Sequence, residues 1–345
     1  MKRAIQTLVG LAVSAGALWL TLRGKDLGAI WAAMRAADYR YLLPYFVILV
    51  AIHLIRTVRW GILLEPVAKV GFWRLNAASA VGIMLLVLLP FRLGEFGRPY
   101  MIAERPRLRV SAALSSVVVE RVADGIITAV LLIVTLLAVP PGTPGLGLLR
   151  AGGVVVFLIF GGLLALLVLA YRNRALAVRI THRLADPISP KLAEKASGMM
   201  DAFIQGLRLV PSRSKVFLFF FLTFVYWAVN GWGLQILARG FGFDIGLIDA
   251  YTVLGVLVVG VMIPAGPGMI GTFQAAVVLA LSLFYSQEAV GTRGNAYANV
   301  LWAAQMGQQV LFGMAFLFSK HIQLDRIFKT QDEMEAALDQ EQASG

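Results

Sequence analysis

The sequence predicts an all-α polytopic membrane protein, and three observations indicate this fold class. Hydrophobic residues make up 59% of the 345 residues, whereas charged residues make up only 14%, well below the roughly 25% of soluble domains. The mean hydropathy is +0.78. Most apolar residues lie in runs that approach the about 20 residues needed for a helix to cross a bilayer. The predicted full spans are 4–22, 42–59, 112–139, 152–171, 216–238 and 298–318.

Two shorter apolar runs each end at a proline and continue into a glycine-rich polar stretch. The first is 78–90, followed by 91–99, and the second is 251–264, followed by 265–274. Runs of this length are too short to cross a bilayer alone, and irregular backbone at that depth needs protein or water around it. Paired interruptions of this kind are typical of transporter binding sites. We therefore predict two re-entrant helical hairpins in a protein that moves a substrate across a membrane.

The first apolar run follows Lys2 and Arg3 and has the general form of a secretory signal. Its end, Leu-Thr-Leu-Arg-Gly-Lys, lacks the small residues of a cleavage site. We therefore expect 4–22 to be a retained first span.

Several classes of chemistry are excluded by what the sequence lacks. There is no Cys, so disulfides, thiolate chemistry and Cys-based metal sites are excluded. The sequence contains no P-loop, nucleotide fingerprint or metal-binding spacing of His and acidic residues. We expect no cofactor, no metal and no ATP-driven step. The net charge of +12 is explained by cytoplasmic loops that meet anionic lipid, rather than by nucleic acid.

Loop charge predicts the orientation of the chain. The 172–215 loop carries nine basic residues against three acidic ones, whereas 140–147 carries no charge. The positive-inside rule places the first loop and both termini in the cytoplasm. The hairpins 78–101 and 251–284 then enter from opposite sides, as an inverted repeat would produce. The 23–40 loop lies outside despite its basic residues, and the spacing of its apolar residues predicts a helix in the membrane interface.

Three charged residues lie inside the apolar run 112–139. Glu120, Arg121 and Asp124 share one face of the predicted helix, and each charge costs about 2.5–3.5 kcal/mol on insertion scales. They must therefore face partners in the protein or a wet cavity. An ion network that only joins helices and a direct role in the substrate path are both open. We predict that Arg121 pairs with Asp124 or with Glu95.

The tip of the first hairpin is the second candidate site. Arg92, Gly94, Glu95 and Arg98 place charges on a backbone that can turn tightly. Arg forms bidentate, permanently charged contacts that suit phosphate. The alternative is an ordinary cytoplasmic loop, which would explain the arginines but neither the short apolar run nor the glycines.

The second hairpin supplies a different kind of candidate. Pro264 ends one helix, and Gly266, Gly268 and Gly271 precede a second helix in which Gln274 lies one turn in. A helix start with unpaired N–H groups favours phosphate or carboxylate. The alternative is a simple kink between two helices.

Arg56 and Arg59 lie one turn apart near the predicted cytoplasmic end of span 42–59. They can face Glu95, Glu120 or a lipid phosphate. The alternative is that both side chains extend to the headgroup region, as basic residues at membrane edges do.

Four motifs occur in a fixed order along the chain. They are Arg56-x-x-Arg59-Trp60, Leu89-Pro90-Phe91-Arg92-Leu93-Gly94-Glu95-Phe96-Gly97-Arg98-Pro99, Val119-Glu120-Arg121-Val122-Ala123-Asp124 and Ile263-Pro264-Ala265-Gly266-Pro267-Gly268. Together they resemble the transmembrane region of the lysylphosphatidylglycerol synthases, a flippase-like family that forms the membrane part of multiple peptide resistance factors. The resemblance implies an integral inner-membrane protein with re-entrant helices that translocates lipid. In the resistance factors the lipid is aminoacylated phosphatidylglycerol, and stand-alone relatives are associated with hopanoid and polyprenyl-linked lipids.

One departure from the family limits the expected activity. A full synthase carries a soluble aminoacyltransferase domain after its membrane region, whereas only 27 residues follow Phe318 here. We expect a single membrane domain, 1–320, and an acidic cytoplasmic tail, 321–345. The chain would not make lysyl-lipid, and either a separate enzyme supplies its substrate or the lipid is another one.

The sequence therefore predicts a lipid flippase that is not an enzyme and that has anionic membrane lipids as partners. The sequence is also compatible with a homo-oligomer. Two rivals stay open. An intramembrane lipid-modifying enzyme would use Glu95, Glu120 or Asp124 as base beside a hydroxyl of Ser115, Ser116 or Thr128. A scaffold would recruit partners through 172–215. A transporter requires a polar cavity that touches both hairpins, whereas a scaffold would pack them without one.

Overall fold

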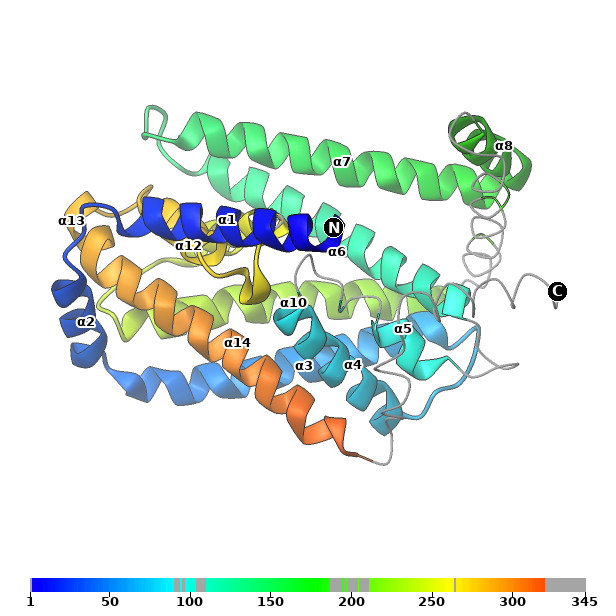
Figure 1. Ribbon diagram of the computed structural model, residues 1–345, viewed down its shortest axis with the longest axis horizontal. Coiled ribbons are helices and arrows are strands. Elements are labelled where there is room, and N and C mark those ends of the chain that lie inside the picture. Colours follow the sequence, from blue (N-terminus) through cyan, green and yellow to red (C-terminus); the bar gives the residue numbers. More distant parts are fainter. Residues whose placement is uncertain are drawn as a thin grey trace.

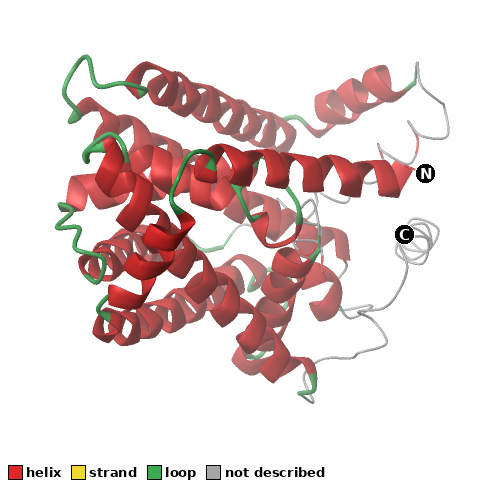
Figure 2. Ribbon diagram, turned by 60° about the vertical axis from the view of Figure 1, so that its left-hand side comes forward, coloured by secondary structure: helices red, strands yellow, loops and turns green. Residues whose placement is uncertain are grey.

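A computed structural model describes residues 2–89, 94, 97–103, 110–186, 194, 197, 204, 211–263 and 265–319, and the regular structure in these residues is helical (Figure 2). Helices occur at all six predicted spans. By length and composition, four segments can cross a membrane: Tyr39–Leu64, Leu146–Arg172, Arg213–Arg239 and Gln287–Leu317. The protein is thus an all-α polytopic membrane protein. The helices at the predicted spans are α1 (Lys2–Leu22), α3 (Leu42–Leu64), α6 (Val110–Leu137), α7 (Leu146–Arg172), α10 (Arg213–Arg239) and α14 (Asn295–Leu317).

Helices α1, α7 and α10 run roughly along the horizontal direction of Figure 1, whereas α14 runs obliquely across the view. Helix α10 packs on α3, and α6 packs on both α7 and α11 (Leu247–Met262). Helix α7 lies at the edge of the bundle. Only 22% of its most apolar 18-residue stretch is buried. Its exposed leucine, isoleucine, valine and phenylalanine side chains suit a surface that faces lipid, because lipid tails solvate apolar side chains as well as a protein core does.

The predicted interfacial helix is α2 (Leu27–Ala36). Asp26 caps it by accepting a hydrogen bond from the Ala29 N–H at 3.1 Å, and this satisfies one of the unpaired donors of the first turn. Ile30 is buried, whereas Leu27 and Trp31 are more than half exposed. This one-sided burial confirms the amphipathic pattern predicted for the 23–40 loop.

The first short helix is α4 (Phe72–Leu88), and the chain returns against it through α5 (Gly97–Ile102). A Cβ added at Gly94 would clash with the backbone of Leu86, and one added at Gly82 would clash with the Arg98 side chain. Position 94 thus lies beside 86 and position 98 beside 82, so the return runs antiparallel to α4. The predicted hairpin is confirmed, and only glycine permits such close approach at Gly94.

The second hairpin consists of α11, the short turn η3 (Pro267–Met269) and α12 (Thr272–Leu281). Gly268 and Gly271 have φ of +68° and +86°, a conformation that favours glycine. The prediction of unpaired N–H groups at the start of α12 is wrong for one of them, because the Gly271 N–H donates to Gln274 Oε1 at 2.7 Å. Helix α1 covers the turn, since the Gly266 N–H donates to Ser14 Oγ at 2.9 Å.

Loops that were predicted to share a membrane side meet at the same end of the bundle. At one end, the Asp38 N–H donates to the Gly240 carbonyl at 2.8 Å, and Arg293 Nη1 donates to the Gly242 carbonyl at 3.3 Å. In a separate contact, Lys215 lies 3.1 Å from Glu65, which joins the start of α10 to the end of α3. The 23–40 loop therefore contacts the segment between α10 and α11, and that segment also contacts Arg293.

Candidate functional site

Five charged side chains from three helices form one buried ion cluster. Arg59 from α3 pairs with Asp124 at 2.6 Å, and Arg98 from α5 lies 3.4 Å from Glu120. Arg121 lies 3.2 Å from Glu120 and 3.3 Å from Asp124. The predicted pairing of Arg121 with Asp124 is confirmed. We call Arg59, Arg98, Glu120, Arg121 and Asp124 the ion cluster.

Burial in the ion cluster is uneven. The side chains of Arg59 and Glu120 are 0% exposed, and that of Arg121 is 33% exposed. Removing one partner of a buried ion pair typically costs about 3–5 kcal/mol, because the other charge stays desolvated and unpaired. Arg59 and Glu120 therefore join α3, α5 and α6, whereas Arg121 also has a face that a ligand can reach. Whether the cluster has a structural role, a role in the substrate path or both stays a prediction.

The Arg59 side chain does not extend to the surface of the protein, because it is 0% exposed. Helix α3 continues to Leu64, and the Arg59 guanidinium lies over the rings of Tyr226 and Phe219 at 5.0 and 5.1 Å. Extension to the headgroup region is thus wrong for Arg59, because the aromatic rings and Asp124 enclose its charge. The predicted end of this span was too early, since the arginines interrupt the apolar run but not the helix.

Two aromatic residues on α10 also bind charged side chains at this site. Trp227 Nε1 donates to Asp124 at 3.2 Å, and Arg56 Nη2 donates to the Tyr226 hydroxyl at 2.7 Å. The sequence analysis missed both residues, although adjacent Tyr and Trp inside an apolar span are a usable signal. Aromatic side chains with one polar atom satisfy charged neighbours inside apolar surroundings.

Arg98 is held in place by aromatic contact as well as by charge. Its guanidinium lies 4.5 Å from the centre of the Trp60 ring, and Trp60 Nε1 donates to Ser116 Oγ at 3.0 Å. Trp60 and Arg98 are 0% and 4% exposed. The short helix α5 thus places its arginine between Trp60 of α3 and Glu120 of α6.

A central cavity of about 420 Å³ lies beside the ion cluster. Both hairpins contribute to its wall, α4 through Leu86, α11 through Met262 and the turn η3 through Met269. The cavity falls within the roughly 300–1,000 Å³ of typical ligand pockets. Its charged lining residues are Arg56, Arg98, Arg121 and Asp124.

Glutamines from α14 form another part of the cavity wall. Gln305, Gln308 and Gln309 line it, and their spacing places them on one face of the helix. The sequence analysis missed these residues as well. Three glutamines within five positions of an otherwise apolar span were the available signal.

The second hairpin contributes apolar rather than polar atoms to the central cavity. Met269 and Phe273 line it, whereas Gly266, Gly268, Gly271 and Gln274 do not. Gln274 instead caps Gly271 and lies 3.4 Å from the Asn299 side chain. Its predicted contact with substrate stays a prediction. Three further predicted site residues lie outside the described residues: Arg92, Glu95 and Pro264.

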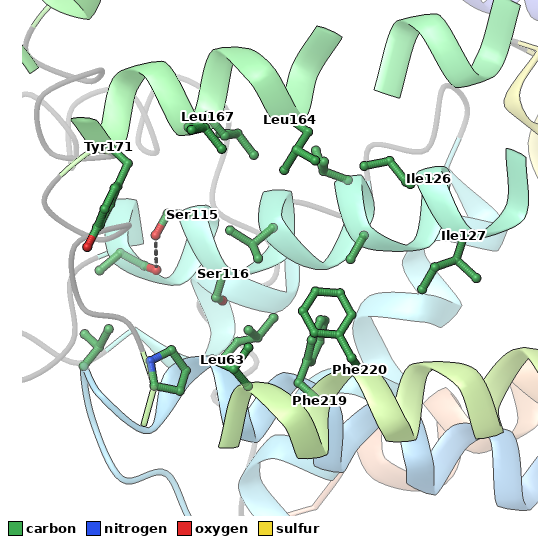
Figure 3. A pocket seen from close by; sticks show the side chains of 18 residues that line it. Leu63, Ser115, Ser116, Ile126, Ile127, Leu164, Leu167, Tyr171, Phe219 and Phe220 are labelled. Atoms are coloured by element: carbon green, nitrogen blue, oxygen red, sulfur yellow. Dashed lines mark hydrogen bonds between the residues drawn. The ribbon is translucent and has the colours of Figure 1, made fainter. Parts of the chain in front are cut away.

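An apolar groove of about 400 Å³ runs along the opposite face of α6. Figure 3 shows it between Leu164, Leu167 and Tyr171 of α7 and Phe219 and Phe220 of α10. Helix α6 therefore separates a polar cavity from an apolar groove. Phe219 belongs to the groove and its ring also lies 5.1 Å from the Arg59 guanidinium, so the groove borders the ion cluster through Phe219.

The sequence of residues 7–293 matches a family described as the lysylphosphatidylglycerol synthase TM region. The match includes all the described charged residues of the ion cluster and both hairpins. No curated protein and no solved structure matches the chain.

Proposed function

We propose that this chain, which belongs to the lysylphosphatidylglycerol synthase transmembrane-region family, moves a lipid with an anionic headgroup between the leaflets of a membrane. The observation that carries the proposal is the central cavity. Three guanidinium groups and one carboxylate line it, and both hairpins form its wall. A positively charged, partly dehydrated cavity attracts phosphate, because its charge is screened less than charge in bulk water.

The cavity favours transport over the two rival functions. A scaffold would pack its hairpins without a polar space, whereas this cavity touches α4, α5, α11 and α12. An enzyme would place a hydroxyl beside a carboxylate. In this protein the hydroxyls of Ser115, Ser116 and Thr128 donate to backbone carbonyls on their own helix. They are therefore hydrogen-bonded within their own helix rather than to the carboxylates of Glu120 or Asp124.

In the proposed cycle, Arg121 exchanges partners. Its contacts with Glu120 and Asp124 are 3.2 and 3.3 Å long, whereas charge-assisted contacts at their best are about 2.7–2.9 Å. A lipid phosphate that reaches the partly exposed Arg121 replaces these contacts with its own oxygens. Arg59 keeps its short pair with Asp124, so the helices stay joined while the phosphate is held.

The charge of the residues that line the central cavity also determines which lipid headgroups it favours. The excess of guanidinium groups favours a net anionic lipid and disfavours an aminoacylated one, whose added ammonium would face Arg56 and Arg98. We place both termini and the 172–215 loop on the cytoplasmic side of a bacterial inner membrane, following the loop charges. The movement is independent of ATP, and a separate enzyme supplies the lipid or the lipid is another one.

The test is lipid exchange in proteoliposomes with fluorescent anionic and zwitterionic phospholipids. Arg121→Gln and Arg56→Gln should slow exchange of the anionic lipid by about tenfold or more, because a charged hydrogen bond is worth about 1.5–3 kcal/mol. The zwitterionic lipid should be less affected. Arg40→Gln removes the same charge from a side chain that is 91% exposed and serves as the control. Wild-type vesicles that exchange no faster than protein-free vesicles would contradict the proposal.

A further inference from the structure

We propose that His53 is a proton-binding site of the central cavity, so that an anionic phosphodiester binding beside Arg56 and Arg98 is accompanied by uptake of a proton on the His53 imidazole. The ligand at this site is the proton itself, taken up together with the anion. The inference rests on the proposed function for its biological meaning, in which the anion is the lipid phosphate. Its test measures binding and proton uptake alone.

The His53 ring is held through one nitrogen, and its other nitrogen has no partner. Its Nε2 lies 3.0 Å from Asn76 Oδ1 of α4. A carboxamide oxygen only accepts hydrogen bonds, so Nε2 carries the hydrogen and Nδ1 of the neutral ring has a free lone pair. Nδ1 makes no hydrogen bond among the described residues, yet it is not one of the enclosed polar atoms that lack a partner. It therefore keeps accessible surface, and the space that His53 lines is the central cavity.

His53 differs from the other ionisable residues on the cavity wall. The arginines that line the cavity keep their charge at every physiological pH. Asp124 already accepts hydrogen bonds from Arg59 at 2.6 Å and from Trp227 at 3.2 Å, which favour its charged form. Among the described residues of the wall, His53 is the side chain whose type normally changes charge between about pH 5 and pH 8. An ionisable group at this depth in a membrane helix is more often functional than incidental.

The groups around His53 explain why its proton is linked to an anion. The ring meets uncharged side chains on α4 and α14, namely Asn76 and Phe312, whose ring centre is 5.2 Å away. The cavity wall also carries charged or titratable groups from three further sources: Arg56 of α3 itself, Arg98 of α5, Arg121 and Asp124 of α6, and Tyr226 of α10. A proton on His53 adds positive charge to a wall in which guanidinium groups already outnumber carboxylates. A bound phosphodiester offsets that repulsion, and by reciprocity the proton tightens binding of the anion.

The experiment measures proton uptake when dibutyl phosphate binds to the full chain in a zwitterionic detergent. This phosphodiester keeps its charge over the range tested, so any dependence on pH comes from the protein. Isothermal titration calorimetry in two buffers of different ionisation enthalpy gives the number of protons taken up for each anion bound. Wild-type protein should take up as much as about one proton. Its Kd should rise by about tenfold between about pH 5 and pH 8, because the contribution of the protonated ring is lost as the pH rises.

The substitution His53→Gln separates the proton from the hydrogen bond. Its carboxamide nitrogen can still donate to Asn76, but the side chain does not titrate. The variant should take up no proton and should bind dibutyl phosphate about tenfold more weakly than wild type at about pH 5, and equally at about pH 8. A role of His53 in joining α3 to α4 alone would leave the proton count unchanged.

The matched control makes the same change at the other histidines. The His182 side chain of α8 (Arg174–Ala185) is 43% exposed, and the double variant His182→Gln/His321→Gln leaves His53 as the only histidine of the chain. It should keep the full uptake, so a failure of His53→Gln to fold leaves the site assignable.

Four results would overturn the inference: no binding of dibutyl phosphate by the wild type, binding without proton uptake, uptake that survives in folded His53→Gln, or uptake lost in the double variant. If uptake at His53 is found but proteoliposomes show no lipid exchange, the proposed function fails and the proton site stands. Exchange without proton uptake would instead leave the proposed function in place and remove the proton site.

Discussion

The two hairpins have similar sequences at their breaks and different surroundings in the fold. The turn after α4 returns through α5, which carries Arg98 into the ion cluster against Glu120. The turn after α11 continues through η3 into α12, where Gln274 caps Gly271 and α1 covers the backbone through Ser14. The first hairpin thus contributes charge to the central cavity, and the second contributes the apolar side chains of Met269 and Phe273.

The difference shows that a glycine-rich break in a membrane helix can serve two ends. At Gly94 the missing side chain lets a charged segment approach the backbone of Leu86. At Gly271 it permits a left-handed turn whose polar groups are satisfied locally. Inside a bilayer the polar groups of irregular backbone need partners within the protein or water, and both arrangements serve that need. Only the first hairpin also places charged groups on the central cavity. The two hairpins should therefore respond differently to substitution.

The largest effect is expected where the first hairpin meets the ion cluster. Glu120→Ala removes a carboxylate that is 0% exposed and leaves Arg98 and Arg121 without it. We expect a loss of about 3–5 kcal/mol in the free energy of unfolding, because Arg98 and Arg121 both lose a fully buried carboxylate and Arg98 is itself only 4% exposed. The measurement is thermal unfolding in detergent.

The matched change in the second hairpin is Asp249→Ala. Asp249 lies in the first turn of α11 and accepts from the Gly246 N–H at 3.0 Å. Loss of such a cap costs about 1 kcal/mol. Similar losses for Glu120→Ala and Asp249→Ala would show that the ion cluster does not carry the stability assigned to it.

A smaller effect is expected at the turn of the second hairpin. Gln274→Ala leaves the Gly271 N–H without its acceptor at 2.7 Å, which should cost about 1 kcal/mol of stability. Lipid exchange should fall no further than this destabilisation explains. Gln274→Glu keeps the acceptor and should retain the cap. A selective loss of anionic-lipid exchange in a stable Gln274→Ala protein would instead assign the second turn to the substrate, as the sequence analysis predicted.

The smallest structural change is expected from two single Cys substitutions, which test whether the two hairpins enter the membrane from opposite sides. Lys69 precedes α4 and Asp244 precedes α11, and both are exposed. Because the chain has no native Cys, single substitutions Lys69→Cys and Asp244→Cys can be labelled in intact cells with a membrane-impermeant reagent. Only Asp244→Cys should react before the membrane is opened, and both should react after. Equal reaction in intact cells would remove the opposed hairpins and the inverted repeat.

The sequence by itself determined the membrane class, the six long helices and the two short breaks. Apolar run length, proline and glycine are local features, and a bilayer converts run length directly into helix length. The charged residues of α6 were also identifiable, since the cost of a charge in an apolar span marks Glu120, Arg121 and Asp124 as paired or functional. Helical spacing made Asp124 one of the two partners predicted for Arg121, and Glu95 was the other.

Only the tertiary structure decided which distant residues share the cavity. The Arg59 pair with Asp124 spans 65 positions, the Trp227 contact with Asp124 spans 103, and the Gln305 contact with Tyr45 spans 260. Polar spacing places the glutamines on one face of α14 but does not say whether that face meets lipid, another helix or a cavity. Helix packing decides which of these the face meets. The ion cluster and the aromatic rings of α10 hold α3, α5 and α6 in positions that leave a cavity between the helices.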